Sequence, residues 1–176
     1  PAASSGEARV AIVGLGRMGL AHAAILKHIP GARVVAAVDR DPGLGRMATS
    51  LGLRAPFFAS AVEAVGRTGA TAAYICTPTF THLELVEALA ARGVDLFVEK
   101  PLGHTLDAAR RMARAASEAR LVTAVGYNLS GERTFQRARA LIARGVLGRV
   151  LRYEASALHG EVFRPREGWL FDPARS

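Results

Sequence analysis

Two ionisable side chains follow directly on a stretch typical of a buried strand. The largely apolar residues 94–98 give way to Glu99 and Lys100, and Pro101 then fixes the backbone so that the chain must leave the strand. A lysine that is partly removed from water at such a point can move a proton, and its ammonium form can polarise a carbonyl group. A solvated lysine paired with a glutamate is the alternative, and position alone does not decide between the two.

A glycine-rich turn forms a second candidate site. Gly14, Gly16 and Gly19 have the spacing GxGxxG between an apolar run and a helical pattern. Gly14 permits a tight turn, Gly16 lets a pyrophosphate approach the backbone, and Gly19 lets the helix pack closely on the strand. Free N–H groups at the helix start would face the phosphates. The pattern predicts a dinucleotide-binding loop that comprises Gly14, Leu15, Gly16, Arg17, Met18 and Gly19.

An acidic residue at the end of the next expected strand completes this motif. Asp39 lies twenty positions after Gly19, where a carboxylate would accept hydrogen bonds from the adenosine ribose. The combination disfavours the structural alternative, a glycine turn followed by a capping aspartate. The carboxylate would repel the 2′-phosphate of NADP, so NAD is favoured as cofactor. Arg40 could bind that phosphate or stack on adenine, which leaves NADP open.

The loop after a later expected strand supplies four more candidates. The run CTPTFTH contains Cys76, Thr77, Pro78 and His82, and loops at the carboxyl ends of parallel strands line the ligand crevice. We therefore expect these residues near the cofactor. From position alone, His82 fits better as a surface residue in the first turn of a helix. Cys76 is expected to be a small buried residue with no partner that would make it a nucleophile.

The segments that position these residues alternate between strand and helix. Apolar runs at 9–14, 33–39, 71–77, 94–98 and 121–127 are separated by helical patterns, with a weak strand near residue 57. Strands that are apolar on both faces and separated by helices predict a parallel sheet covered on both sides. We expect a doubly wound α/β domain that binds NAD(P) over residues 9–126, after a flexible lead-in at 1–8.

Local signals place the starts of two of the helices. Ser60 with Glu63, and Thr81 with Glu84, have the spacing of a capping box. Gly93 is expected in a left-handed conformation after the second of these helices.

Residues 127–176 follow a different pattern. A helical segment at 132–145 precedes residues 150–158, where apolar and polar residues alternate as in a strand with one exposed face. Such a strand suits an antiparallel sheet, and a lone strand is not stable. We expect the start of a second, α+β domain for substrate binding or oligomerisation, left incomplete at Ser176.

Charge and hydropathy argue against several other classes of protein. Of the net charge of +8, residues 1–100 contribute ten basic and eight acidic groups, and residues 101–176 contribute thirteen and seven. The later arginines lie on polar helix faces without interleaved aromatic residues, which favours a solvated surface over a nucleic-acid surface. No apolar run approaches the roughly 18 residues of a membrane span, and the single cysteine fits a reducing compartment. We expect a cytoplasmic protein without membrane, nucleic-acid or metal partners.

Taken together, the motifs resemble one family. The runs AIVGLGRMGLAH, VVAAVDRD, YICTPTFTHLELVEALAARGVDLFVEKPL and GYN, with a later GVLGRV, closely resemble the Gfo/Idh/MocA oxidoreductases, the glucose-fructose oxidoreductase and inositol dehydrogenase superfamily. The resemblance implies a Rossmann domain in which Lys100 assists proton transfer and Glu99 contacts the nicotinamide ribose. It also implies that the nicotinamide half is lined by Thr77, Pro78, His82 and Asn128, the last near the carboxamide.

The implied activity is hydride transfer between a sugar- or polyol-like hydroxyl and the nicotinamide. Many members carry an arginine after GYN, where this chain has Leu129 and Ser130, and continue into a glycine-rich segment with an aspartate and a histidine. Asp172 lacks such a histidine partner. The chain is therefore expected to be a cofactor-binding half that is inactive alone, with oligomerisation open if the second domain is complete. A stand-alone nucleotide-binding or regulatory module and a nicotinamide-dependent glycosidase remain as alternatives.

Overall fold

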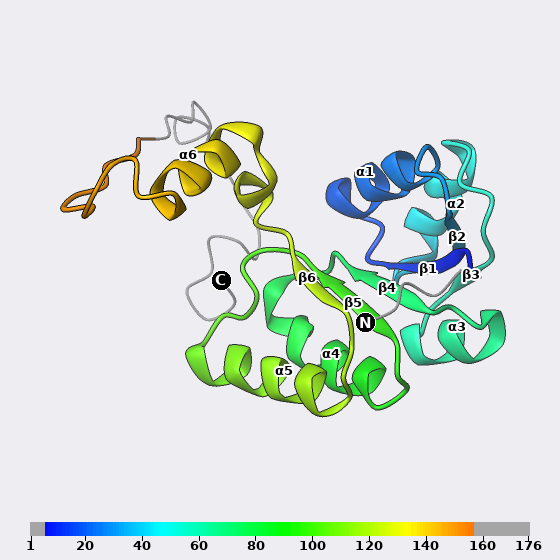
Figure 1. Ribbon diagram of the computed structural model, residues 1–176. Helices are drawn as coiled ribbons and strands as arrows, with labels where there is room; N and C mark the ends of the chain where they lie inside the picture. The colour runs from blue at the N-terminus through cyan, green and yellow to red at the C-terminus, as the bar shows by residue number, and fades with distance from the viewer. Residues whose placement is uncertain (1–5, 157–176) are drawn as a thin grey trace, which may run out of the picture.

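A six-stranded parallel sheet forms the centre of the protein. A computed structural model describes residues 6–156, and its strands follow the order β3-β2-β1-β4-β5-β6 (Figure 1). The order reverses between β1 and β4, which is the switch point at which doubly wound sheets bind ligands. The predicted fold class is thereby confirmed. The strands are β1 (Ala8–Val13), β2 (Ala32–Val38), β3 (Phe57–Phe58), β4 (Ala72–Ile75), β5 (Asp95–Val98) and β6 (Thr123–Val125).

Helices cover both faces of this sheet. Figure 1 shows α1 and α2 on one side, and α3, α4 and α5 on the other. Successive side chains of β1 point to opposite faces, so Val10 and Ile12 pack in one buried cluster, and Ala11 and Val13 pack in the other. These helices are α1 (Arg17–Leu26), α2 (Pro42–Ser50), α3 (Ala61–Thr68), α4 (His82–Ala90) and α5 (Leu106–Glu118), with a 3-10 turn η1 (Thr79–Thr81) before α4.

The edge strand β6 differs from the expectation of strands buried on both faces. Thr123 and Ala124 are exposed and Val125 is half-buried. The reason is the position of β6 at the end of the sheet, where β5 is its one partner strand in the described residues. After β6 come a 3-10 turn, η2 (Asn128–Gly131), and helix α6 (Arg133–Ala143), which extends away from the sheet in Figure 1.

Of the helix and the strand expected after β6, only the helix forms within the described residues. Helix α6 forms where predicted, but no side chain of it is buried against the residues that the structure describes. The strand expected at 150–158 is absent over 151–156, where Leu151 is 81% exposed and Tyr153 is 69% exposed. A strand needs a partner, and residues 6–156 offer it none. Expectations for residues 1–5 and 157–176 lie outside the described part.

The two predicted capping boxes have different outcomes. The Ser60 hydroxyl accepts the N–H of Glu63 at 3.4 Å at the start of α3, as predicted. Thr81 does not cap α4, because the preceding turn η1 leaves it with near-helical backbone angles instead of the extended ones that a capping residue needs. Its hydroxyl lies instead 2.7 Å from both the Thr77 hydroxyl and the Pro78 carbonyl. Gly93 has the expected left-handed backbone, with φ of +69°.

No helix among residues 6–156 has the length and apolar character needed to cross a membrane.

Candidate functional site

The glycine loop between β1 and α1 has the geometry that its spacing predicts. Gly14 has φ of +94°, and a Cβ there would lie 2.8 Å from the backbone carbon of Cys76. A Cβ on Gly19 would lie 1.8 Å from the Gly14 carbonyl oxygen, so only glycine lets α1 approach the loop this closely. Gly16 is different, because a Cβ there would meet no protein atom within 4 Å. Space above Gly16 is therefore open to a ligand.

The start of α1 offers unpaired backbone donors to that open space. Gly16 is the N-terminal capping residue, and no side chain forms a capping hydrogen bond there. The first N–H groups of a helix lack partners within the helix and carry the positive end of its dipole. Arg17 and Met18 are exposed at this end, whereas Leu15 is fully buried below the loop. The arrangement suits an anion such as a pyrophosphate.

Asp39 joins the end of β2 to the glycine loop. One carboxylate oxygen accepts the Leu15 N–H at 2.7 Å, and the other accepts the Asp41 N–H at 2.9 Å. The side chain is therefore fixed while it is only half-buried, and a carboxylate has further lone pairs that can accept from ligand hydroxyls. Arg40 is exposed, and it forms no hydrogen bond or ion pair within residues 6–156.

His82 is part of the scaffold behind the loop that follows β4. It is only 1% exposed, and its Nε2 lies 2.9 Å from the Thr77 carbonyl while its Nδ1 lies 3.0 Å from the Leu102 carbonyl. A neutral imidazole donates to one of these oxygens, and an imidazolium donates to both. The interpretation of His82 as a surface residue is wrong, because the turn η1 directs the start of α4 inward. His82 braces Thr77 and would affect a ligand through that residue.

Cys76 lies half-buried at the end of β4, beside Gly14. Burial, and secondly the negative charge of Glu99, raise the pKa of the Cys76 thiol from 9.0 to about 12. The thiol therefore stays protonated near neutral pH and lacks nucleophilic character. This agrees with the expectation that Cys76 is not a nucleophile, although it is less buried than expected.

Glu99 has a partner that the sequence motifs did not reveal. His22 of α1 lies with its Nε2 2.7 Å from Glu99 Oε1, and the second carboxylate oxygen accepts the Lys100 N–H at 3.1 Å. The two residues are 77 positions apart, so no local spacing could pair them. The one available signal was the place of His22 on α1, three residues after Gly19 on the helix that follows the glycine loop.

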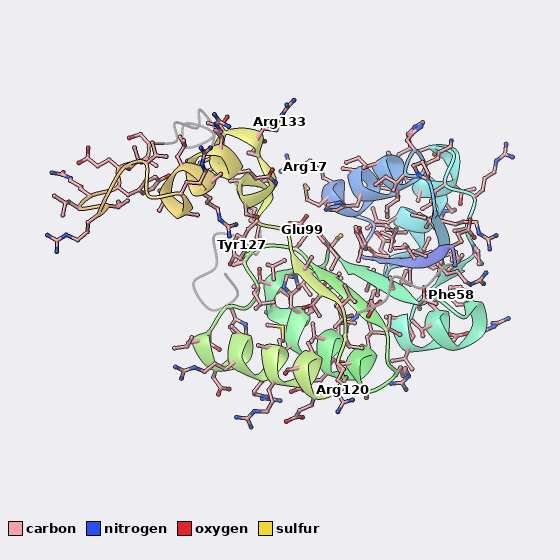
Figure 2. The ribbon with its side chains drawn as sticks, in the orientation of Figure 1. Arg17, Phe58, Glu99, Arg120, Tyr127 and Arg133 are labelled. Carbon is pink, nitrogen blue, oxygen red and sulfur yellow. The ribbon has the colours of Figure 1, made fainter. Side chains whose placement is uncertain are left out.

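An open cavity of about 370 Å³ lies beside this pair. Its walls include Met18, His22, Glu99, Lys100 and Asn128, so four of the predicted site residues meet at one place. Figure 2 labels Glu99 of this wall together with Tyr127, which also lines the cavity.

The environment of Lys100 differs from the expectation. Lys100 is exposed, and its ammonium group has no hydrogen bond or ion pair within the described residues. The prediction that it is partly removed from water is therefore wrong for this part of the chain, because the cavity is open on the side where the lysine lies. Its side chain is free to meet a ligand in the cavity.

The donor and acceptor set fits a dinucleotide. Helix α1 presents N–H groups above an open Gly16, the end of β2 presents a fixed carboxylate, and the end of β5 presents Glu99 and Lys100. All of these lie at the carboxyl ends of parallel strands, around the switch point of the sheet. Thr77, Pro78 and Cys76 follow β4 at the same edge but do not line the cavity.

Comparison with known proteins agrees with this geometry. The sequence model of the family GFO_IDH_MocA, described as "Oxidoreductase family, NAD-binding Rossmann fold", matches residues 8–127. The myo-inositol 2-dehydrogenase of Thermotoga maritima is 32% identical over 142 residues, which cover 80% of this chain and 42% of that protein. The 2,7-anhydro-N-acetylneuraminate hydratase of Mediterraneibacter gnavus is 31% identical over 160 residues, which cover 90% and 42%.

Solved structures of related dehydrogenases share the fold of this chain. The scyllo-inositol dehydrogenase of Lactobacillus casei with bound NAD(H) and scyllo-inositol superposes with a TM-score of 0.72 at 26% identity, over 80% of this chain and 42% of that one. The chain thus spans less than half the length of the relatives that it matches. The family model covers the sheet, the glycine loop and the cavity wall up to Tyr127, and the resemblance inferred from the motifs is confirmed. The chain belongs to the Gfo/Idh/MocA oxidoreductase family and has its NAD-binding Rossmann fold.

Proposed function

We propose that this chain is the cofactor-binding part of an NAD(P)-dependent oxidoreductase that acts on a sugar- or polyol-like hydroxyl group. The observation that carries the proposal is the convergence of the glycine loop, Asp39, and the Glu99–Lys100 pair on one edge of the sheet. The inositol dehydrogenases among the relatives support the substrate class. NAD is favoured over NADP, because Asp39 is a fixed carboxylate where a 2′-phosphate would have to lie.

Each part of the edge has a distinct task in this proposal. The N–H groups at the start of α1 hold the pyrophosphate over Gly16, and Asp39 accepts hydrogen bonds from the adenosine ribose. Glu99 accepts from the nicotinamide ribose, and Asn128 lies near the carboxamide. When bound, the nicotinamide supplies the carbon that accepts or donates the hydride.

Lys100 exchanges a proton with the substrate hydroxyl. Oxidation of an alcohol removes a hydride from carbon and a proton from oxygen, so a base or a proton relay must stand beside the hydroxyl. The Lys100 amino group supports this role, since no protein acceptor in residues 6–156 engages it. Its neutral amine accepts the hydroxyl proton when the alcohol is oxidised, and its ammonium form returns that proton when the carbonyl is reduced. Because the chain spans 42% of its relatives, we expect the chain alone to bind cofactor with little or no turnover.

One relative favours a second candidate activity. The hydratase among the relatives is named for the addition or removal of water, and not for a net oxidation. A bound nicotinamide can serve such a reaction by oxidising the substrate and reducing it again within one turnover. In that case the cofactor is unchanged at the end of the cycle. In an assay of a protein that also contains the substrate-binding part, product analysis with less NAD than substrate distinguishes the two, because a net dehydrogenase consumes one NAD for each product formed.

The direct test of the proposed function is a calorimetric titration of the chain with NADH and NADPH in parallel. We expect saturable binding of NADH, weaker binding of NADPH, and at least a roughly tenfold loss of NADH affinity in an Asp39→Ala variant. Asp95→Ala is the matched control, because Asp95 also accepts a backbone N–H, from Val122 at 2.9 Å, but at the opposite end of the sheet. Absence of binding of either cofactor to the unmodified chain would contradict the proposal.

A further inference from the structure

We propose that His22 is a positioning residue that holds the Glu99 carboxylate in place for the nicotinamide half of the cofactor. The inference rests on the proposed function and extends it to a residue of α1 outside the dinucleotide motif. His22 lies one helical turn beyond the phosphate-binding end of α1, and Glu99 follows β5. Their contact joins the element that holds the pyrophosphate to the element that carries Lys100.

The hydrogen bonds fix both oxygens of Glu99. An ionised carboxylate only accepts hydrogen bonds, so the His22 Nε2, which lies 2.7 Å from Oε1, must carry the hydrogen. The Lys100 N–H donates to Oε2 at 3.1 Å. The side chains of His22 and Glu99 are only 18% and 11% exposed, so water competes weakly for this bond. The carboxylate therefore has one orientation in the cavity wall and keeps further lone pairs for ligand hydroxyls.

Two aromatic rings and the backbone of Gly126 confine the pair. The rings of Tyr74 and Phe97 stack at 4.5 Å, and the imidazole of His22 meets them edge-on at 5.5 and 4.9 Å. A Cβ on Gly126, after β6, would lie 3.1 Å from Glu99 Oε2 and 3.3 Å from the Phe97 ring. A space that a single Cβ would fill leaves the carboxylate little room to rotate. The imidazole thus acts as a donor held rigid by aromatic packing.

The two possible roles of His22, filling space and positioning Glu99, lead to different expectations for ligand binding. If His22 only filled space, its loss would loosen α1 and weaken every ligand of the glycine loop. If it positions Glu99, its loss should weaken ligands that include the nicotinamide ribose and spare those that lack it. ADP contains the adenosine ribose and two phosphates but no nicotinamide ribose, so ADP and NADH separate these cases.

The experiment is therefore a calorimetric comparison of NADH and ADP on variants of this chain. We expect His22→Leu to bind NADH about tenfold more weakly than the unmodified chain and to bind ADP unchanged. His22→Gln, whose amide can still donate to Glu99, should recover most of the NADH affinity. Glu99→Gln should lose a similar factor, and adding His22→Leu to it should cost little more, because both changes break the same bond. His28→Leu, an exposed histidine after α1, is the matched control.

The outcomes separate the two proposals. Equal loss of NADH and ADP affinity in His22→Leu, or no loss of either, would overturn the role of His22 and leave the proposed function intact. Failure of the unmodified chain to bind NADH would overturn the proposed function and this role with it. If His22→Leu does not fold, nitrogen NMR of the unmodified chain decides. The His22 Nε2 resonance should report a hydrogen-bonded N–H and shift with NADH but not with ADP, and no shift with NADH would refute the inference.

Discussion

Two carboxylates of this site are held in place by hydrogen bonds from backbone N–H groups. Asp39 holds two such bonds, and Glu99 holds one together with the imidazole of His22. A charged acceptor that is already oriented needs little rearrangement when hydroxyls of a ligand arrive. Lys100, by contrast, is the exposed cation of the cavity wall. The site therefore combines two oriented acceptors with one exposed donor.

The Cys76 thiol gives a pH-dependent prediction. Burial and the Glu99 charge raise its pKa from 9.0 to about 12, so the folded state favours the protonated form. This contribution to stability is fully present below pH 9.0 and is lost as the pH rises through about 12. At pH 9.0 we expect alkylation of Cys76 to be slower in the folded chain than in the urea-unfolded chain by roughly five hundredfold, because the thiol is half ionised when unfolded and almost wholly protonated when folded. Glu99→Gln should speed alkylation modestly, and equal rates in folded and unfolded chains would contradict the prediction.

At the scale of elements, the close approach of α1 to the β1 loop decides whether the site exists. The Gly14 and Gly19 backbones touch where a side chain would collide, while Gly16 faces open space. The same three-glycine spacing thus contains two positions that the packing of the backbone requires and one that is open to a ligand. The contact between His22 of α1 and Glu99, which follows β5, then sets the distance between the glycine loop and the end of β5.

Alanine substitution should separate these two kinds of glycine. Gly19→Ala places a Cβ 1.8 Å from the Gly14 carbonyl oxygen, so α1 must move, and we expect the free energy of unfolding to fall by roughly 3 kcal/mol. Gly16→Ala should change it by less than about 0.5 kcal/mol and still weaken NADH binding roughly tenfold, because its Cβ occupies the space for the pyrophosphate. Urea unfolding and calorimetry measure the two effects. A Gly16→Ala chain with full affinity would argue against phosphate binding at this loop.

Over residues 6–156 the molecule divides into a buried sheet with its five helices and an exposed region, residues 128–156. The core clusters draw on β1 to β5 and on α1 to α5, whereas α6 buries no side chain within the described residues. Apolar side chains such as Ile142, Leu147 and Leu151 are exposed there. An unpartnered helix of this length is marginal in water. The two regions should therefore differ in local stability.

Hydrogen exchange tests this difference. In a dilute sample of this chain, we expect amides of α6 to exchange almost as fast as in an unfolded peptide, while amides of β1 and β4 exchange only through global unfolding. The exposed apolar side chains give a second expectation, that protection of α6 rises with protein concentration as chains associate through this surface. Equal protection of α6 and β4 in a dilute, monomeric sample would contradict both.

The features that depend on local pattern could be predicted from the amino-acid sequence. Alternating apolar runs and helical spacing specify the sheet and its helices, and the glycine spacing with Asp39 specifies the loop, because these signals lie within one βαβ unit. The Ser60 cap is equally local, since its partner is three residues away. The Thr81 cap was wrong because the preceding turn, formed around Pro78, sets its backbone angles.

Contacts between side chains that are distant in sequence could not be predicted, because they depend on how the helices pack on the sheet. His22 reaches Glu99 across 77 positions because α1 packs on β1, β2 and β4, which brings the imidazole against the ring of Phe97 on β5. His82 is buried, and the segment after β5 supplies the Leu102 carbonyl that its Nδ1 contacts. Lys100 and β6 are exposed because no other element of the described residues packs over them, and their own sequence does not reveal this. Local spacing fixes the direction of a backbone, but hydrogen bonds and burial between elements depend on the packing of the whole sheet.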